Sequence, residues 1–510
     1  MAASAHPATD RTATDDPPAP AARSIRVGGW AAALPPILLA GLAAWGLGRR
    51  GFWIDEAISV GATHELWSTL KGTSGTMALY YGALTPWSSF STDRAWLRSL
   101  SVLCTAAALA AVWSAVRRAF GREVALLATT IAAASWLVVR YAQEARSFAL
   151  ALLLTSVAWC ALVATARAED EDGHRSDRSR RWWAVFAVAS VVAPLAHGLA
   201  VLQFFGQLGF LAWAPDRNRW LRRARPVIVG VVAVSAALVA GGASDIASWI
   251  PPLDRDQLAE LLAAFTAPFG WGQAVLAALV LVGAVACIRR HRAATEPVER
   301  WFALLPLAWA FVPVVTLVVM SIVRPYLVAR YVAGSAPGVA LLLAFAIVGP
   351  TLRPSWRRAL PVGLAIAAVL AAGQVHLHRD TSDDWAGAAA IVASGARPGD
   401  ALVLPNPSLR SAFDYGWLEV ADAASPAPRS ISPVEPLGTV RRFYRVVAPD
   451  ALDETVAGQP EGRIWVVDQA RRGDSALDGL LDGDAVASAF RVVRDTELEG
   501  DVRVVLLERR

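Results

Sequence analysis

The sequence predicts an α-helical polytopic membrane protein that ends in a small α/β domain. Of its 510 residues, 55% are apolar and only 18% are charged, and the mean hydropathy is +0.41. This balance is too apolar for a soluble chain of this length, and it excludes disordered, collagenous and disulfide-scaffold proteins. The apolar residues form runs close to the roughly 20 residues that a bilayer requires, and these runs stop near residue 375.

Residues 1–28 are rich in Ala, Pro, Thr and Asp without periodicity, so we expect a disordered cytoplasmic tail. A membrane domain of about eleven transmembrane helices is expected over 29–375. A turn at His197 and Gly198 is expected to divide the long run 182–214 into two helices. The eleven predicted spans are 30–48, 97–116, 123–139, 147–166, 182–196, 198–214, 226–243, 271–288, 301–323, 332–349 and 359–375.

Arginine supplies almost all of the positive charge, because Lys71 is the single lysine. The net charge is +5, but the arginines punctuate apolar segments, which favours a membrane topology over nucleic-acid binding. If the N-terminus is cytoplasmic, the inside segments carry 23 Lys and Arg and the short outside loops carry 10. The positive-inside rule then predicts an integral plasma membrane protein with a cytoplasmic N-terminus and an extracytoplasmic C-terminal domain.

Residues 376–510 regain charges and have only short apolar runs, which is typical of a small α/β domain. Strands are expected at 401–404, 464–467 and 502–507, and a helix at 385–396. The segment contains no phosphate loop, metal motif or nucleophile elbow. We therefore expect it to be structural or to cover a site rather than to catalyse a reaction.

The first candidate site is the pair Asp55 and Glu56, directly after the first span. On a helix these side chains point about 100° apart, so that one could reach a substrate while the other orients a loop or binds a metal. Desolvation beside Trp53 and Ile54 would raise the pKa of a carboxyl group and suit it to general-base catalysis. The alternative is an acidic pair that stabilises a helix N-terminus.

Further polar side chains are expected at the same outer surface. A tight turn after the third span either lines a cavity or forms a salt-bridged cap; its candidates are Tyr141, Gln143, Glu144 and Arg146. A later outside loop suits an anionic ligand or, alternatively, lipid headgroups with a tyrosine belt; its candidates are Arg324, Tyr326, Arg330 and Tyr331.

Three weaker signals remain. His197 is a lone histidine between two apolar helices, where packing is the commoner role. His376 and His378 form a His-x-His pair, which is weak evidence for a metal. Residues 253–262 are expected to form an amphipathic helix on the membrane surface.

The order and sidedness of these motifs over roughly 30–380 resemble GT-C membrane glycosyltransferases. The pattern is similar to the bacterial glycosyltransferase family 39 group, which includes protein O-mannosyltransferases and aminoarabinose transferase-like enzymes. The resemblance implies that a sugar passes from a polyprenyl-phosphate donor to an acceptor hydroxyl at the outer face, with inversion. It implies no nucleic-acid partner.

The resemblance also implies roles for single residues. Asp55 would accept the acceptor's proton, and Glu56 would orient Asp55 or contact the acceptor. The negative charge that develops on the leaving phosphate would be stabilised by Arg146, Arg330 and Arg324. The sugar hydroxyls or the carboxylate would be held by Gln143, Glu144 and His197. Mannose is the default sugar. The acceptor (a glycan, lipid or protein) is left open, as are a divalent metal and its ligands.

Two departures and two alternatives accompany the resemblance. The sequence lacks the β-trefoil module of eukaryotic protein O-mannosyltransferases, and only Lys71 could act as a phosphate-binding lysine. The main alternative is a transporter or flippase of a lipid-linked substrate, although no internal repeat is evident. The other alternative is a non-catalytic scaffold that presents the C-terminal domain.

Overall fold

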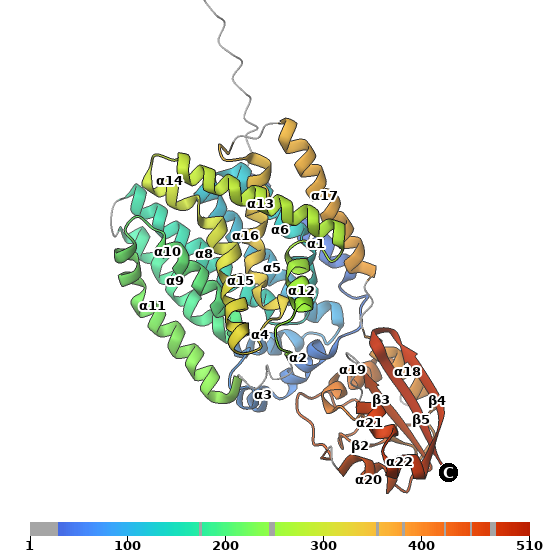
Figure 1. Ribbon diagram of the computed structural model, residues 1–510. Helices are drawn as coiled ribbons and strands as arrows, with labels where there is room; N and C mark the ends of the chain where they lie inside the picture. The colour runs from blue at the N-terminus through green and yellow to red at the C-terminus, as the bar shows by residue number, and fades with distance from the viewer. Residues whose placement is uncertain are drawn as a thin grey trace, which may run out of the picture.

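The computed structural model describes residues 29–172, 176–243, 250–352, 356–379, 383–422, 425–448, 451–469 and 476–510. The predicted tail, 1–28, lies outside the described residues. Figure 1 shows a bundle of long helices with a smaller mixed domain at one end. We call the end of the bundle beside this domain the near end and the opposite end the far end.

Each of the eleven predicted apolar segments coincides with one or two helices of the bundle. In chain order these helices are η1 (Gly29–Ala33), α1 (Leu34–Gly46), α5 (Arg94–Phe120), α6 (Arg122–Ala134), α7 (Trp136–Ala142), α8 (Phe148–Glu171), α9 (Asp177–Ala196), η2 (Gly198–Ala200), α10 (Val201–Ala212), α11 (Arg217–Leu238), η3 (Val239–Ala243), α13 (Gly270–Ala293), α14 (Pro297–Phe302), α15 (Leu305–Val323), η5 (Ala329–Ser335), α16 (Ala336–Val348) and α17 (Trp356–Arg379).

Seven of the described helices are long and apolar enough to cross a membrane, or eight if the bent pair α6 and α7 forms one span. The two members of that pair meet at 62°. The predicted break at His197 is confirmed, because its extended backbone separates α9 from η2. The polytopic helical fold is thus confirmed. By length and composition, seven or eight of the eleven predicted spans within the described residues are helices that could cross a membrane.

Four further helices gather at the near end of the bundle (Figure 1). Three of them, α2 (Ile54–His64), α3 (Leu66–Gly72) and α4 (Ala78–Ser88), lie between α1 and α5 and were not predicted. The fourth, α12 (Arg255–Phe265), corresponds to the predicted amphipathic helix and begins with a capping box between Asp254 and Gln257.

The C-terminal domain is a five-stranded sheet in the order β2-β1-β3-β5-β4. β1 (Ala401–Val403) is parallel to β2 (Arg429–Ser432) and β3 (Arg463–Gln469), whereas β5 (Val502–Arg509) is antiparallel to β3 and to β4 (Phe490–Leu498). The expected strands 401–404, 464–467 and 502–507 match β1, β3 and β5; β2 and β4 were not expected.

Helices cover both faces of this sheet. One face packs on α18 (Trp385–Gly395), the expected helix at 385–396, and on α19 (Arg410–Val420). The other face packs on α20 (Leu452–Ala457), α21 (Ala476–Leu481) and α22 (Asp484–Ala489). Two short 3₁₀ helices, η6 (Pro407–Leu409) and η8 (Glu499–Asp501), complete the domain.

The domain is joined to the near end of the bundle by a shared apolar core. Phe52, Val60 and Tyr81 from the near end belong to the same buried cluster as Phe413 and Trp465 of the domain. The predicted boundary at 375/376 falls inside α17, which continues to Arg379. Because apolar contacts cross between the two parts, the C-terminal domain holds a fixed place over the near end of the bundle.

Candidate active site at the near end

The start of α2 presents two neighbouring carboxylates in different surroundings. Asp55 and Glu56 both lie in the first turn, where the helix dipole favours negative charge. The side chain of Asp55 is 23% exposed, whereas that of Glu56 is 1% exposed. The expected divergence of the two side chains is therefore present, and Asp55 is the one that solvent and ligands can reach.

Glu56 is closed off by a buried ion pair with Arg98 of α5. The Nε and Nη2 atoms of Arg98 donate to its two carboxylate oxygens at 2.8 and 2.7 Å, and the amide of Ala145 donates to Oε1 at 2.7 Å. Arg98 also donates to the carbonyls of Leu47, Arg50 and Gly51. The pair therefore fixes the loop before α2, and both oxygens of the Glu56 carboxylate are engaged inside the protein.

Asp55 pairs with Arg146, which lies between α7 and α8. Nη2 of Arg146 is 3.2 Å from the Asp55 carboxylate, and Nη1 donates to the backbone carbonyl of Asp55 at 3.1 Å and to Ser59 at 3.3 Å. Burial disfavours the charge on Arg146, but Asp55, together with Tyr81 and Glu144, outweighs burial and raises the pKa of Arg146. Arg146 thus stays charged and orients the Asp55 carboxylate.

Two other candidates in this turn anchor it to neighbouring helices. Arg140 pairs with Glu144 at 2.7 Å. Gln143 accepts from Arg50 at 2.7 Å and donates to the carbonyl of Ala43 at 2.9 Å, at the end of α1. The salt-bridged cap that was left as an alternative is therefore present, but it does not use every polar atom of the turn.

Several buried polar atoms beside the Asp55–Arg146 pair lack a hydrogen-bond partner within the described parts of the chain. They belong to residues no more than two positions from Asp55 or Arg146: Nε1 of Trp53, Oε2 of Glu144, Nε of Arg146 and Oγ of Ser147. An unmet buried polar atom costs roughly 1–3 kcal/mol. Their concentration at one place indicates a site that a polar ligand completes.

The later outside loop joins this site through aromatic contacts. The guanidinium of Arg330 in η5 lies 5.6 Å from the Trp53 ring and 5.8 Å from the Tyr331 ring. Tyr331 lies 5.2 Å from His197, and His197 lies 5.0 Å from Phe148. The structure thus brings Asp55, Arg146, His197, Arg330 and Tyr331 into one cluster, although they are far apart in sequence.

His197 is uncharged in this cluster. Desolvation in the turn between α9 and η2 lowers the pKa of His197 to about 3, and the charges of Arg146 and Arg330 act in the same direction. A neutral imidazole can donate from one ring nitrogen and accept at the other. Such a ring can form hydrogen bonds with a neutral hydroxyl group without adding positive charge to the cluster.

The remaining candidates lie at the margin. Arg324 is exposed and lies 5.7 Å from the ring of Tyr326, which packs against the bundle core. Tyr141 packs on Phe148 at 5.0 Å. Lys71 is exposed at the end of α3.

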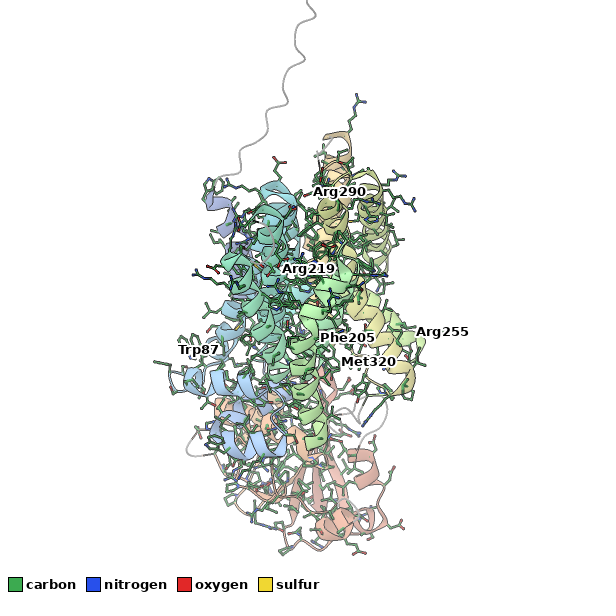
Figure 2. The ribbon with its side chains drawn as sticks, turned by 90° about the vertical axis from the view of Figure 1, so that its left-hand side faces the viewer. Trp87, Phe205, Arg219, Arg255, Arg290 and Met320 are labelled. Carbon is green, nitrogen blue, oxygen red and sulfur yellow. The ribbon has the colours of Figure 1, made fainter. Side chains whose placement is uncertain are left out.

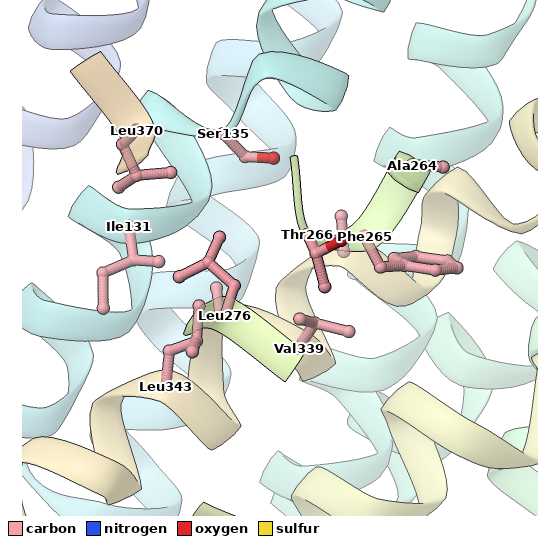
Figure 3. A pocket seen from close by; sticks show the side chains of 11 residues that line it. Ile131, Ser135, Ala264, Phe265, Thr266, Leu276, Val339, Leu343 and Leu370 are labelled. Atoms are coloured by element: carbon pink, nitrogen blue, oxygen red, sulfur yellow. The ribbon is translucent and has the colours of Figure 1, made fainter. Parts of the chain in front are cut away.

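Two pockets lie next to the cluster. A small pocket is lined by His197, Gln203, Arg330 and Tyr331 and by apolar side chains of α8. A second pocket, between α6, α12, α13, α16 and α17, is almost wholly apolar (Figure 3). Its walls include Ile131, Phe265 and Leu343, with Ser135 at its rim.

A metal site is not evident in the described part of the chain, where no group of three or more His, Cys, Asp and Glu side chains could hold an ion. His378 of the His-x-His pair stacks on Trp45 at 4.1 Å, and its Nδ1 lies 2.7 Å from the carbonyl oxygen of Gln374. Asp55 and Glu56 are engaged by two arginines. The described residues therefore do not fit a divalent cation.

Sequence reasoning missed several residues that build the site. Arg98 could have been suspected, because an arginine in the second turn of an apolar span is costly without a partner. Ser59 and Tyr81 carried no signal in the sequence.

Comparison with known proteins supports the resemblance to membrane glycosyltransferases. A family model described as dolichyl-phosphate-mannose-protein mannosyltransferase matches residues 90–240. No curated protein matches the sequence. The crystal structure of ArnT from Cupriavidus metallidurans bound to undecaprenyl phosphate is similar to this chain at 14% identity and a TM-score of 0.59, covering 94% of this chain and 98% of that one.

Two further crystal structures share the fold. ArnT from Cupriavidus metallidurans in the apo state is 15% identical, with a TM-score of 0.57 and the same coverage of 94% and 98%. The oligosaccharyltransferase of Archaeoglobus fulgidus in its apo form is 11% identical, with a TM-score of 0.50, and the match covers 86% of this chain and 70% of that one.

The chain therefore has the fold of the GT-C membrane glycosyltransferases, and the predicted resemblance to that superfamily is confirmed. Within this fold, its bundle with an α/β domain at one end is similar to ArnT over nearly the whole length of both chains.

Proposed function

We propose that the protein is a membrane glycosyltransferase that moves a sugar from a polyprenyl-phosphate donor to an acceptor hydroxyl, with inversion at the anomeric carbon. The observation that carries this proposal is the half-open Asp55–Arg146 pair, surrounded by buried polar atoms that lack partners. The printed description of the ArnT structure, which names undecaprenyl phosphate as its ligand, supports the class of donor.

Asp55 acts as the general base in this proposal. Its carboxylate accepts the proton of the acceptor hydroxyl while that oxygen attacks the anomeric carbon. The bond from the anomeric carbon to the phosphate oxygen breaks, and its electron pair leaves with the lipid phosphate. Arg146 contacts the carboxylate through Nη2, and its Nη1 holds the backbone carbonyl of Asp55 and the Ser59 hydroxyl, so the base is already oriented before the reaction.

The leaving phosphate lies on the face of the sugar opposite the attacking oxygen, because the reaction inverts the anomeric carbon. Arg146 is committed to Asp55, so Arg330 is the better candidate to stabilise the phosphate charge. Oε2 of Glu144 and the neutral ring of His197 are free to hold sugar hydroxyls.

The chemistry is assigned to the extracytoplasmic face of the plasma membrane, with the N-terminus in the cytoplasm. Arginine counting supports this orientation, and Arg219 and Arg290 lie towards the far end, in the half of the bundle away from the C-terminal domain (Figure 2). Trp87 and Arg255 lie closer to that domain. By resemblance, mannose is the proposed sugar, and a glycan, lipid or protein hydroxyl is the acceptor.

The test is a transfer assay on purified protein in lipid, with radiolabelled undecaprenyl-phosphate mannose and a panel of hydroxyl acceptors. Wild type is compared with Asp55→Asn, which keeps size and shape but cannot accept the proton. Loss of one general base is expected to lower kcat by roughly 10²–10⁴-fold. Asp256→Asn is the matched control, because Asp256 is exposed in the first turn of α12, and it is expected to transfer like wild type.

Undiminished transfer by folded Asp55→Asn would remove Asp55 as the base. If wild type yields no product with any acceptor, flux of the labelled lipid across vesicles is measured next. Flux without a covalent product would favour the transporter or flippase hypothesis over a transferase.

A further inference from the structure

One loop of the C-terminal domain reaches into the near end of the bundle. The guanidinium of Arg442 lies 5.4 Å from the Tyr81 ring, and its Nη1 donates to the Tyr81 hydroxyl at 2.8 Å. Tyr81 belongs to α4, within electrostatic reach of Arg146. The domain therefore places a positive charge on Tyr81, which in turn acts on Arg146.

The backbone next to Arg442 is held in place from both sides. The Ser411 hydroxyl of α19 donates to the carbonyl of Arg441 at 2.6 Å, and the amide of Arg441 donates to the Tyr444 hydroxyl at 2.8 Å. On the other side, the loop lies directly on α2 at Gly61. A Cβ atom there would stand 2.4 Å from the carbonyl oxygen of Arg441, so only glycine allows this approach.

Arg442 differs from its two arginine neighbours in having no counter-ion. Arg441 pairs with Glu65 at 3.4 Å, and Arg445 pairs with Glu435 at 3.3 Å. Across the described ranges, no carboxylate lies within ion-pair distance of Arg442, and its buried Nε atom has no hydrogen-bond partner. A partly buried guanidinium with an unmet donor is costly unless an anion completes it.

The chemistry of the two side chains fits a phosphate. Arginine presents a planar fork of donors that matches two phosphate oxygens. The Tyr81 hydroxyl accepts from Arg442 and donates to the sulfur of Met77 at 3.6 Å, which is a weak acceptor, so its proton can turn to a phosphate oxygen instead. Asp55 already balances the charge of Arg146, and Arg442 therefore adds net positive charge.

We propose that Arg442, supplied by the C-terminal domain, binds the phosphate of the polyprenyl-phosphate donor together with Tyr81. The inference rests on the proposed function, since it takes the donor class from it. It gives the C-terminal domain a direct part in substrate binding, in addition to the covering role that the sequence suggested. Arg330 and Arg442 then approach the phosphate from the bundle and from the domain respectively.

The test measures binding of undecaprenyl phosphate to the purified full chain in detergent, so that no acceptor is needed. Arg442→Ala is expected to weaken binding about 10–100-fold, the loss of one charge-assisted contact with a desolvated anion. Arg442→Lys is expected to recover part of the loss, because it restores the charge without the fork. Arg445→Ala is the control, since Arg445 lies in the same loop, is 82% exposed and is paired with Glu435.

Competition by inorganic phosphate separates the headgroup from the lipid chain. Free phosphate is expected to displace undecaprenyl phosphate from wild type more effectively than from Arg442→Ala. Gly61→Ala provides a second variant that keeps the arginine but displaces its loop, and it is expected to weaken binding in the same direction.

The outcomes separate this inference from the function on which it rests. If wild type binds undecaprenyl phosphate and Arg442→Ala, with an unchanged melting temperature, binds it equally well, Arg442 is not a phosphate ligand and the proposed donor stands. If wild type does not bind undecaprenyl phosphate, the donor class and the role of Arg442 both fail.

Discussion

The far and near ends of the helical bundle use arginine in opposite ways. At the far end, the buried carboxylate of Glu169 accepts from Arg219 and Arg223, and Glu299 accepts from both Arg167 and Arg290 at 2.8 Å. Glu169 of α8 holds two arginines of α11, and Glu299 of α14 holds Arg167 of α8 together with Arg290 of α13. The far end is therefore closed by ion pairs that link α8, α11, α13 and α14.

At the near end, the pairs divide into a closed one and an open one. Glu56 and Arg98 are almost fully buried, whereas the neighbouring Asp55 is partly exposed in its pair with Arg146. Arg442 adds a guanidinium without a carboxylate in the described parts of the chain. The difference is one of pairing within the described parts of the chain: Glu169 and Glu299 each accept from two arginines, whereas Asp55 pairs with Arg146 alone and Arg442 has no carboxylate partner.

The largest expected effect tests the closed pair. Arg98→Ala leaves the Glu56 carboxylate buried without its partner, so we expect a loss of roughly 3–5 kcal/mol in stability. Thermal unfolding of the detergent-solubilised protein checks this. Arg94→Ala is the matched control on the same helix. It removes an ion pair with Glu419 whose side chains are 25% and 24% exposed, and it should cost no more than about 1 kcal/mol.

Equal melting temperatures for the two variants would show that Arg98 is not a structural residue. The distinction between a closed and an open pair at the near end would then be lost.

The next effect separates the two ends by function. Arg330→Ala removes the proposed phosphate-binding charge, and we expect the KM for the polyprenyl-phosphate donor to rise about 10–100-fold. Arg290→Ala removes an arginine that pairs with Glu299 at the far end, and it should leave this KM unchanged while lowering the melting temperature. Initial rates over a range of donor concentrations measure both variants.

A similar rise in KM for Arg290→Ala would mean that the far end communicates with the donor site. An unchanged KM for Arg330→Ala would instead leave Arg442 as the principal phosphate ligand to test.

Most of the bundle was predictable because each helix has to bury or embed an apolar run, which is visible in the sequence. The predicted break at His197 and the helix at 253–262 had local signals of the same kind. Helices α2, α3 and α4 were missed because they are short and of mixed polarity. Strand β4 was missed because it is largely exposed and reads as a charged segment.

The site was predictable where one residue type carries an unusual cost. Asp55, Arg146, Arg330 and His197 could be selected as candidates because polar side chains at an apolar boundary are costly, and the structure brings these four together. The division of work between Asp55 and Glu56 was not predictable, since it depends on Arg98, which is 42 positions away from Glu56. The contact between Arg442 and Tyr81 could not be predicted for the same reason, because the two residues are 361 positions apart in the sequence.

The smallest expected effect concerns an arginine that is paired but belongs to neither end. On the C-terminal sheet, Arg503 donates to the Asp495 carboxylate at 2.9 and 2.5 Å, and these hydrogen bonds hold the pKa of Asp495 below its usual value. Because the folded-state pKa is lowered, the stabilisation is present above the unfolded pKa of about 3.9 and is lost as the pH falls through the folded pKa. The Asp495 side chain is 39% exposed, so solvent screening reduces the effect to about 0.5 kcal/mol.

Asp495→Asn should therefore destabilise the C-terminal domain slightly at pH 7. The difference from wild type should begin to shrink as the pH falls below about 4 and should vanish once the pH is below the folded-state pKa of Asp495. Urea unfolding of this domain in the full chain, followed by limited proteolysis at several pH values, measures the difference. Donor binding should not change at pH 7. This pair lies on β4 and β5 at one edge of the sheet, whereas β1, which leads to α19, lies towards the other edge. A loss of donor binding in Asp495→Asn would mean that the sheet as a whole, rather than the Arg442 loop, sets the geometry of the near end.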